Sequence, residues 1–228
     1  MKTGNAIEVR KLSKSFGGRT LFQDFNLDIK KNSVHAIIGP NGSGKTTLLR
    51  MLTGLYKKDS GEIEVSGDHA ILLENDYLYD EKSGLENLKI FGLYFGYKLE
   101  NYGKYSDLLN LTEHLEKRVS TYSKGMKRKL SLLVIILMDK EIIFLDEVTS
   151  GVDPISRVEI RKIIKGLKDA GKTIIITSHD LSEVEKIADY ISMIEEGQLL
   201  LNLSQKEIEG KSLEDIFIKA GENYEKSK

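Results

Sequence analysis

Three short segments of the chain alternate between apolar and polar residues. They cover residues 7–9, 25–29 and 62–65, and the first two are separated by the pair Gly17-Gly18. A period of two residues is typical of strands that bury one face and expose the other. The pattern predicts half-exposed strands in the first third of the chain, with a turn at Gly17-Gly18.

Two later segments, residues 142–145 and 173–177, are rich in β-branched residues and carry no charge. Strands of a parallel sheet are covered on both faces and commonly show such unbroken runs. These segments predict central strands of a parallel sheet.

The segment between these two runs has the signals of a helix. Asp153 can cap its N-terminus, Pro154 suits the first helical position, and Gly171 can end it. Apolar residues recur at the spacing of one helix face. The predicted buried stripe consists of Ile155, Val158, Ile163, Ile164 and Leu167.

The middle of the chain, from Leu85 to about Met138, also has a helical pattern. Its apolar positions include Leu108, Leu109, Leu111 and Leu115. Residues 221–228 are mostly polar and predict a frayed tail.

The composition limits the classes of function. Lys and Arg number 34 against 35 Asp and Glu, and no basic run marks a nucleic-acid partner. Cysteine is absent, which excludes disulfides and thiol chemistry. The longest apolar stretch, residues 130–138, is shorter than the about 20 residues of a membrane span, and residues 1–5 lead into no apolar signal segment. We expect a soluble, cytoplasmic protein with no nucleic-acid partner.

The strongest chemical signal is the segment Gly39–Thr46, which reads G-P-N-G-S-G-K-T. It follows the β-branched run 34–38 and opens a helical segment that stops at Gly54, which is the context of a phosphate-binding loop. Backbone N–H groups of such a loop and the N-terminus of its helix attract phosphate. Lys45 supplies a cation for the β- and γ-phosphates, and the Thr46 hydroxyl can bind Mg²⁺. The segment predicts a site for a nucleoside triphosphate.

Two carboxylates follow the predicted strand 142–145. Asp146 stands at the end of a buried strand, where Mg²⁺ or its water would be held. Glu147 stands where a carboxylate can orient and polarise an attacking water. Acidic residues often cap strand ends, but the phosphate loop in the same chain favours the metal-binding and catalytic roles.

Three further segments resemble motifs of the ATP-binding-cassette (ABC) ATPases. Tyr122–Arg128 resembles the signature sequence, usually L-S-G-G-Q, Ser150–Asp153 resembles the D-loop, and His179 resembles the switch histidine. Together with the phosphate loop and the acidic pair, they occur in the order of that family across residues 5–220. The chain is therefore similar to enzymes that bind and hydrolyse ATP with Mg²⁺.

The resemblance implies roles that spacing alone does not assign. Phe16 occupies the place of the aromatic residue that stacks on adenine, with a core or turn role as the alternative, and Thr47 matches the residue that touches the α-phosphate. Ser123 and Gly125 match signature residues that contact the γ-phosphate of the partner subunit's ATP. The implied ATP-binding residues are Phe16, Asn41, Gly42, Ser43, Gly44, Lys45, Thr46, Thr47, Ser123 and Gly125, and the implied catalytic residues are Glu147, His179 and Lys45.

Two motifs depart from the family pattern. The signature has the form S-K-G-M-K, which resembles ATPases of bacterial exporters whose membrane subunits are separate chains. The glutamine of the family's Q-loop is replaced by Glu74, or by Asn75 if the alignment slips by one residue. Glutamate would add negative charge near Glu147. The implied metal-binding residues are Thr46, Asp146 and Glu74.

The resemblance implies a single α/β domain over residues 1–228. A RecA-like parallel core with a small antiparallel β-region is expected at residues 1–74 and 139–220, and an inserted α-helical lobe at residues 75–138. The long interval between the phosphate loop and the acidic pair leaves room for that lobe. A small GTPase would bring its metal-binding aspartate earlier and carry an N-K-x-D motif, which is absent.

The resemblance also implies partners. Two ATPase subunits, in a homodimer or pseudo-dimer, would enclose two ATP molecules head to tail, and hydrolysis would reopen the dimer. We expect the energy-coupling subunit of an exporter, held at the cytoplasmic face of the membrane by separate transmembrane subunits. The alternative is a soluble ABC ATPase that acts in iron–sulfur assembly or on nucleic acids.

Aromatic residues concentrate between residues 77 and 105. About half are expected to fill the core of the helical lobe. The others are expected to form the groove that in this family receives a helix of the membrane subunit, from Tyr77 and Tyr79 up to Phe95, so that docking falls near residues 75–97. The eight aromatic residues are Tyr77, Tyr79, Phe91, Tyr94, Phe95, Tyr97, Tyr102 and Tyr105.

Overall fold

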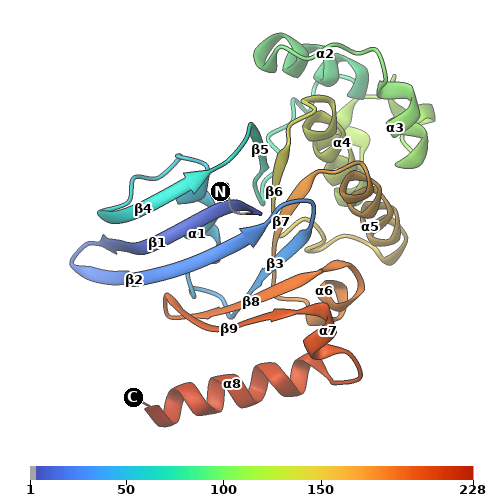
Figure 1. The fold of residues 1–228 in the computed structure, drawn as a ribbon. Coiled ribbons are helices and arrows are strands. Elements are labelled where there is room, and N and C mark those ends of the chain that lie inside the picture. The colour runs from blue at the N-terminus through green and yellow to red at the C-terminus, as the bar shows by residue number, and fades with distance from the viewer. Residues whose placement is uncertain (1–3, 228) are drawn as a thin grey trace.

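A three-stranded antiparallel sheet forms one side of the molecule in the computed structural model, which describes residues 4–227 (Figure 1). Its strands lie in the order β2-β1-β4, with bounds β1 (Asn5–Phe16), β2 (Arg19–Lys30) and β4 (Ser60–Val65). Gly17 and Gly18 have φ angles of 54° and 82° and join β1 to β2. Glycine adopts this left-handed backbone without steric cost, so the predicted turn is confirmed.

The larger sheet has six strands in the order β5-β6-β7-β3-β8-β9. The first five are parallel, and β9 pairs with β8 in the antiparallel direction. This arrangement confirms the predicted α/β fold with a parallel core and a small antiparallel region. The strands are β3 (Val34–Ile38), β5 (His69–Leu72), β6 (Ile142–Asp146), β7 (Thr173–Ser178), β8 (Tyr190–Glu195) and β9 (Gln198–Ser204).

The parallel sheet separates two hydrophobic clusters. On β6, Ile142 and Phe144 belong to the cluster shared with the antiparallel sheet and α1 (Lys45–Leu52). Ile143 and Leu145 belong to the cluster shared with α4 (Lys124–Leu137) and α5 (Pro154–Asp169). Since successive residues of a strand point to opposite faces, both faces are apolar. The runs 142–145 and 173–177 are unbroken because both faces of these strands are covered.

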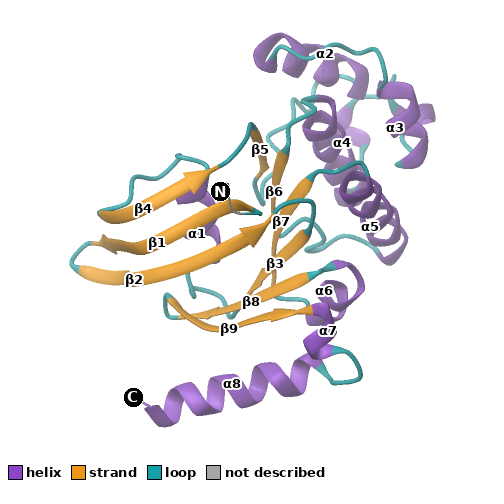
Figure 2. Cartoon of the chain, viewed as in Figure 1, coloured by secondary structure: helices purple, strands orange, loops and turns teal. Residues whose placement is uncertain are grey.

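The helical lobe lies at the end of the molecule away from the antiparallel sheet (Figure 2). Its buried leucines Leu109, Leu111 and Leu115 join the same cluster as the core, whereas Leu108 is exposed. The lobe is therefore not a separate hydrophobic unit, and its boundary at residue 138 stays a prediction. Over the predicted range 75–138 it comprises α2 (Gly84–Phe95), α3 (Tyr102–Leu108), two short 3₁₀ turns, Thr112–His114 and Val119–Thr121, and α4 (Lys124–Leu137).

Helix α5 (Pro154–Asp169) begins and ends as predicted, but its buried stripe differs. The Asp153 side chain accepts a hydrogen bond from the Ser156 amide (3.0 Å). Ile155 and Val158 are exposed, by 74% and 40%, so their predicted burial is wrong. The face turned inward there carries Ser156, Glu159 and Ile160 instead. Glu159 is buried because it pairs with Lys129 of α4, and a buried ion pair leaves no apolar signal in the sequence.

The predicted frayed tail is also wrong over the residues that the structure describes. Residues 221–227 belong to α8 (Leu213–Ser227), which follows α6 (Leu181–Ile187) and α7 (Gln205–Ile208) and runs beside β9 (Figure 1). Leu213 and Phe217 pack against the main core, and the Tyr224 hydroxyl donates a hydrogen bond to Glu196. These contacts hold a helix that its polar last turns did not predict.

Candidate active site

The glycine-rich loop joins β3 to the N-terminus of α1. Gly44 caps the helix with a φ of 109°, and a Cβ atom there would lie 2.6 Å from the ring of Phe22. Gly42, with a φ of 83°, also has left-handed backbone. A side chain would strain both positions. The loop therefore curls tightly over Phe22 and presents its backbone at the N-terminus of α1, where anions are favoured.

The Lys45 side chain folds back onto this loop. Its ammonium donates hydrogen bonds to the carbonyl oxygens of Gly39 (2.7 Å) and Pro40 (3.1 Å). Burial lowers the pKa of Lys45, and the carboxylates of Glu147 and Asp146 oppose that shift. The cation is held by neutral oxygens, which the charged oxygens of a phosphate can replace.

Asp146 ends β6 beneath the loop and is 1% exposed. Its Oδ1 atom accepts hydrogen bonds from the hydroxyls of Thr46 (3.1 Å) and Thr177 (2.6 Å), whereas its buried Oδ2 atom has no hydrogen-bond partner. A buried carboxylate oxygen without a partner beside a hydroxyl suits a hard cation such as Mg²⁺, which prefers oxygen ligands. In the part of the chain that the structure describes, no cluster of three or more His, Cys, Asp or Glu could hold a metal by itself. The residues therefore fit Mg²⁺ that shares its ligands with the nucleotide phosphates.

Glu147 follows Asp146 and faces His179. Its Oε2 atom lies 2.9 Å from Nδ1 of His179. The Glu147 amide donates a hydrogen bond to the Thr177 hydroxyl (3.0 Å), so one threonine fixes both acidic residues. Glu147 has a φ of 50°, a strained conformation for a residue with a side chain. The chain turns sharply here and brings the carboxylate into the pocket.

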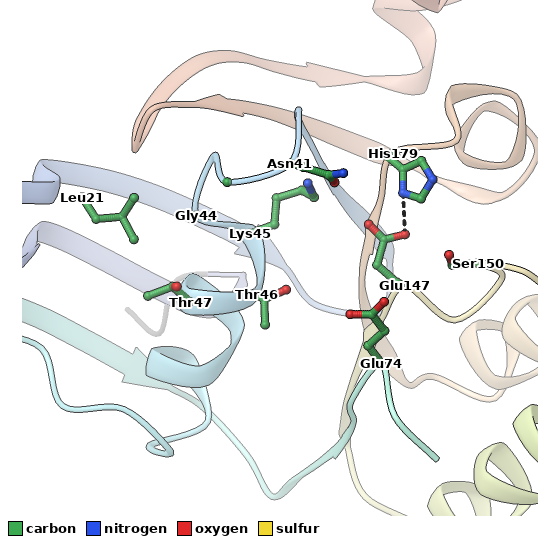
Figure 3. A pocket seen from close by; sticks show the side chains of 11 residues that line it. Leu21, Asn41, Gly44, Lys45, Thr46, Thr47, Glu74, Glu147, Ser150 and His179 are labelled. Atoms are coloured by element: carbon green, nitrogen blue, oxygen red, sulfur yellow. Dashed lines mark ion pairs between the residues drawn. The ribbon is translucent and has the colours of Figure 1, made fainter. Parts of the chain in front are cut away.

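Most of the predicted site residues share one cavity of about 400 Å³. Figure 3 shows Asn41 and Lys45 on the loop, with Glu147 and His179 facing them across the pocket and Glu74 below. Ser43, whose buried hydroxyl has no hydrogen-bond partner, lies within the loop. The pocket is lined by Leu21, Asn41, Gly42, Gly44, Lys45, Thr46, Thr47, Glu74, Glu147, Ser150 and His179.

Five predicted residues do not line this pocket: Ser43 and Asp146, whose surroundings are given above, and Phe16, Ser123 and Gly125. Phe16 is 47% exposed at the end of β1, beside Tyr56 and Lys14, and its role toward adenine stays a prediction. Ser123 caps α4 by accepting a hydrogen bond from the amide of residue 126 (3.2 Å). At Gly125 a Cβ atom would lie 2.6 Å from the Oδ2 atom of Asp153, whose side chain is held as the N-cap of α5, so the absence of a side chain at Gly125 allows the close approach of α4 to this segment.

The two candidates for the Q-loop position line different cavities. Glu74 lines the pocket with the phosphate loop, whereas Asn75 lines an apolar recess of about 140 Å³ next to α2 and α4. This placement favours the alignment on Glu74.

Sequence reasoning missed four residues of the site. Ser150 stands in the D-loop motif and Thr177 ends an apolar run, so both had a signal in the sequence. Arg128 ends the segment that resembles the signature, but nothing in the sequence indicated its role, and Leu21 had no signal, because only the folded chain brings Leu21 to the pocket and surrounds Arg128 with backbone oxygens.

A phosphate loop, a buried aspartate and a glutamate paired with histidine define a phosphate-loop ATPase. The model of the family described as "ABC transporter" matches residues 22–150. Two relatives support the match. The lantibiotic transport ATP-binding protein SrtF of Streptococcus pyogenes is 36% identical over 92% of this chain and 95% of its own. The bacitracin transport ATP-binding protein BcrA of Bacillus licheniformis is 34% identical over 85% of this chain and 68% of its own.

A solved structure described as the ATP-binding subunit of an ABC transporter has the same fold. It superimposes with a TM-score of 0.85 over 95% of this chain and 99% of its own, at 22% identity. The chain belongs to the ABC transporter family. It is an ATP-binding subunit and an ATPase of that family, as the sequence predicted.

Proposed function

We propose that this pocket hydrolyses ATP with the residues that it brings together. The β- and γ-phosphates bind the loop amides, and the Lys45 ammonium exchanges the carbonyl oxygens of Gly39 and Pro40 for them. Glu147 orients the attacking water and accepts its proton, and His179 holds that carboxylate in place. The observation that carries the proposal is the meeting of Lys45, Glu147 and His179 in one cavity.

Mg²⁺ would be held by Thr46 and Asp146, with Glu74 as a third ligand, and when bound it would neutralise charge on the phosphates. Thr177 keeps Asp146 oriented. The Oδ2 atom of Asp146 supports this assignment because a cation or its water would satisfy it.

A second subunit would complete the site. Ser123 is exposed and lies outside the chain's own nucleotide pocket. Ser123 and Gly125 would reach the γ-phosphate of a partner's ATP in a head-to-tail dimer, whether the partner is a second copy or a related chain. A substitution at Gly125 would also disturb the packing of α4 against Asp153, so a substitution at Ser123 gives the clearer test.

The cargo pathway would be supplied by separate membrane subunits. Within residues 4–227, no helix is both long and apolar enough to cross a bilayer. The names of SrtF and BcrA assign them to transport of a lantibiotic and of bacitracin. We infer that this chain drives an exporter from the cytoplasmic face of the membrane.

The apolar recess next to α2 is the docking site that we assign to the membrane subunit. Four of the eight lobe aromatics pack against the core, and four are exposed. Tyr77 and Phe95 are exposed by 67% and 50% and line the recess, whereas Tyr79 lies beside it without lining it. The exposed aromatics are Tyr77, Tyr79, Tyr94 and Phe95, and the packed ones are Phe91, Tyr97, Tyr102 and Tyr105.

The variant Glu147→Gln tests the proposed chemistry. It keeps the size of the side chain but removes the base, so turnover should fall by about 10²-fold or more while ATP affinity stays unchanged. Lys45→Ala is the contrasting variant, because it should weaken ATP binding itself. Steady-state hydrolysis and equilibrium ATP titration measure the two effects. Near-normal hydrolysis by Glu147→Gln would remove Glu147 from the proposed role.

A further inference from the structure

Arg128 is a buried cation with an unusual set of partners. It lies in the second turn of α4, and its side chain is only 4% exposed. Its guanidinium donates hydrogen bonds to Leu73 O (2.6 Å), Glu74 O (3.2 Å), Asp76 Oδ1 (3.2 Å), Asp146 O (2.5 Å) and Val148 O (3.2 Å).

These acceptors lie on two segments that are distant in the sequence. One is the loop 73–76 after β5, and the other is the end of β6, residues 146–148. The first segment places Glu74 in the nucleotide pocket, and the second places Glu147 there. Arg128 therefore bridges the backbones that position two acidic residues of the same site.

The bridge needs the shape of arginine as well as its charge. A guanidinium is planar and carries five N–H donors in a fixed fork, whereas the ammonium of lysine has three donors around one atom. The fork directs separate N–H donors at both segments and at five acceptors, which is more than the three donors of lysine can serve. Four of the five acceptors are backbone carbonyls, so the bonds fix the path of the chain more than they neutralise charge.

We propose that Arg128 is a positioning residue that fastens the Glu74 loop to the catalytic end of β6 and to α4. The inference rests on the proposed catalytic role of Glu147. Glu74 faces the nucleotide pocket, and its neighbours Asn75, Asp76 and Tyr77 line the apolar recess. Arg128 thus gives a displacement at the recess a direct path to the carboxylates, through bonds of one side chain.

The purified full chain tests this role with Arg128→Gln. The loop loses its fastening, so the amides of residues 73–78 should exchange hydrogen faster in the absence of nucleotide. Turnover should fall on the order of 10²-fold, because small displacements of a catalytic group have effects of this size. ATP affinity should stay within about threefold, because the phosphate loop keeps its own contacts.

Lys129→Met is the matched control. Lys129 is adjacent on α4 and about as buried, but its ammonium pairs with Glu159 of α5 and is recorded in no hydrogen bond to either segment. Its loss should lower the melting temperature and leave turnover and the exchange of residues 73–78 unchanged. An equal loss of turnover in Lys129→Met would overturn the proposal, since any buried ion pair of α4 would then have the same effect.

Arg128→Lys keeps the test decisive if Arg128→Gln does not fold. It preserves the positive charge without the fork, so it should show the same loss of turnover and the same faster exchange. Recovery of turnover by lysine would assign the effect to charge and overturn the bridge. Unchanged exchange at residues 73–78 would also overturn it, and that result does not depend on whether Glu147 is the base.

Discussion

The nucleotide pocket and the helical lobe differ in how their functional groups are satisfied. In the pocket, Asp146 and Glu147 are bonded to Thr46, Thr177 and His179 of the same chain. In the lobe, the signature serine and four aromatic rings lie exposed to solvent. The acidic residues of the proposed site are therefore held in place by their own chain. The lobe has the properties of surfaces completed by other chains, in which exposed aromatic residues are enriched.

The largest effect should come from the signature serine. In a Glu147→Gln background with ATP and Mg²⁺, the protein should form a closed dimer, and adding Ser123→Arg should prevent it. The bulky side chain would clash at two symmetric contacts, for a loss of about 4 kcal/mol. Light scattering measures the dimer, and Ser120→Arg, exposed in the neighbouring turn, is the control. A dimer unaffected by Ser123→Arg would contradict the claim that another chain completes the lobe surface, because the signature would then make no contact between subunits.

The recess should show the next largest effect. Tyr77→Asp places a charge in the apolar docking surface and should weaken binding of the membrane subunit by about 2 kcal/mol, or roughly 30-fold. Aspartate tolerates the left-handed backbone at this position, where φ is 47°. Co-purification measures the partner, and ATP titration should show unchanged nucleotide binding.

Leu93→Asp is the control for the recess. Leu93 is 88% exposed on the same helix as Phe95 and does not line the recess. If Leu93→Asp releases the membrane subunit and Tyr77→Asp does not, docking lies on another face of α2.

A smaller effect is expected at Glu74, where the two regions meet. Glu74→Ala should raise the Mg²⁺ concentration for half-maximal hydrolysis by about tenfold, since loss of a metal-orienting group has effects of this order. Glu74→Gln keeps a neutral oxygen and should retain most of the activity. Hydrolysis measured across a Mg²⁺ titration distinguishes the two variants, and an unaltered titration in Glu74→Ala would exclude a metal role.

The smallest effect is a pH dependence of the free energy of unfolding, which we expect from a buried histidine of the core. Burial lowers the pKa of His35 in β3 to about 4, while the unfolded chain keeps its usual value of about 6.5. The unfolded state therefore binds more protons in this range, and the free energy of unfolding should fall as pH decreases. The expected loss between pH 7 and pH 5.5 is about 1 kcal/mol.

Urea titrations at both pH values measure this loss. His35→Gln should reduce the difference, whereas His114→Gln, in the lobe, is the control. A difference that persists in His35→Gln would assign the pH dependence to other groups.

The sequence predicted the fold where local pattern and tertiary structure agree. The β-branched runs became buried strands. Helix α5 begins after Asp153, at Pro154, and ends shortly before Gly171, as expected. The prediction failed at the first turns of α5 because Glu159 is buried through an ion pair that residue types alone do not reveal. It failed at residues 221–227 because contacts with Glu196 and the core hold the helix.

For the site, contiguous motifs were predictable and bridges between distant segments were not. The phosphate loop and the acidic pair are local in sequence, and the structure brings them together. Arg128 belongs to the segment that resembles the signature, but the sequence does not reveal its role, since its acceptors are mostly carbonyl oxygens that every residue possesses. Such a residue is found only when the fold shows which backbone it meets.

The backbone at Glu147 has a consequence for how far this protein can be stabilised. Its left-handed conformation, with a φ of 50°, costs about 1–3 kcal/mol for a residue with a side chain, and glycine would relieve that cost. Selection for thermal stability alone would favour replacement of the residue that we assign as the base. Stability and activity are therefore opposed at this position, and a thermostable variant of this ATPase must gain its stability elsewhere.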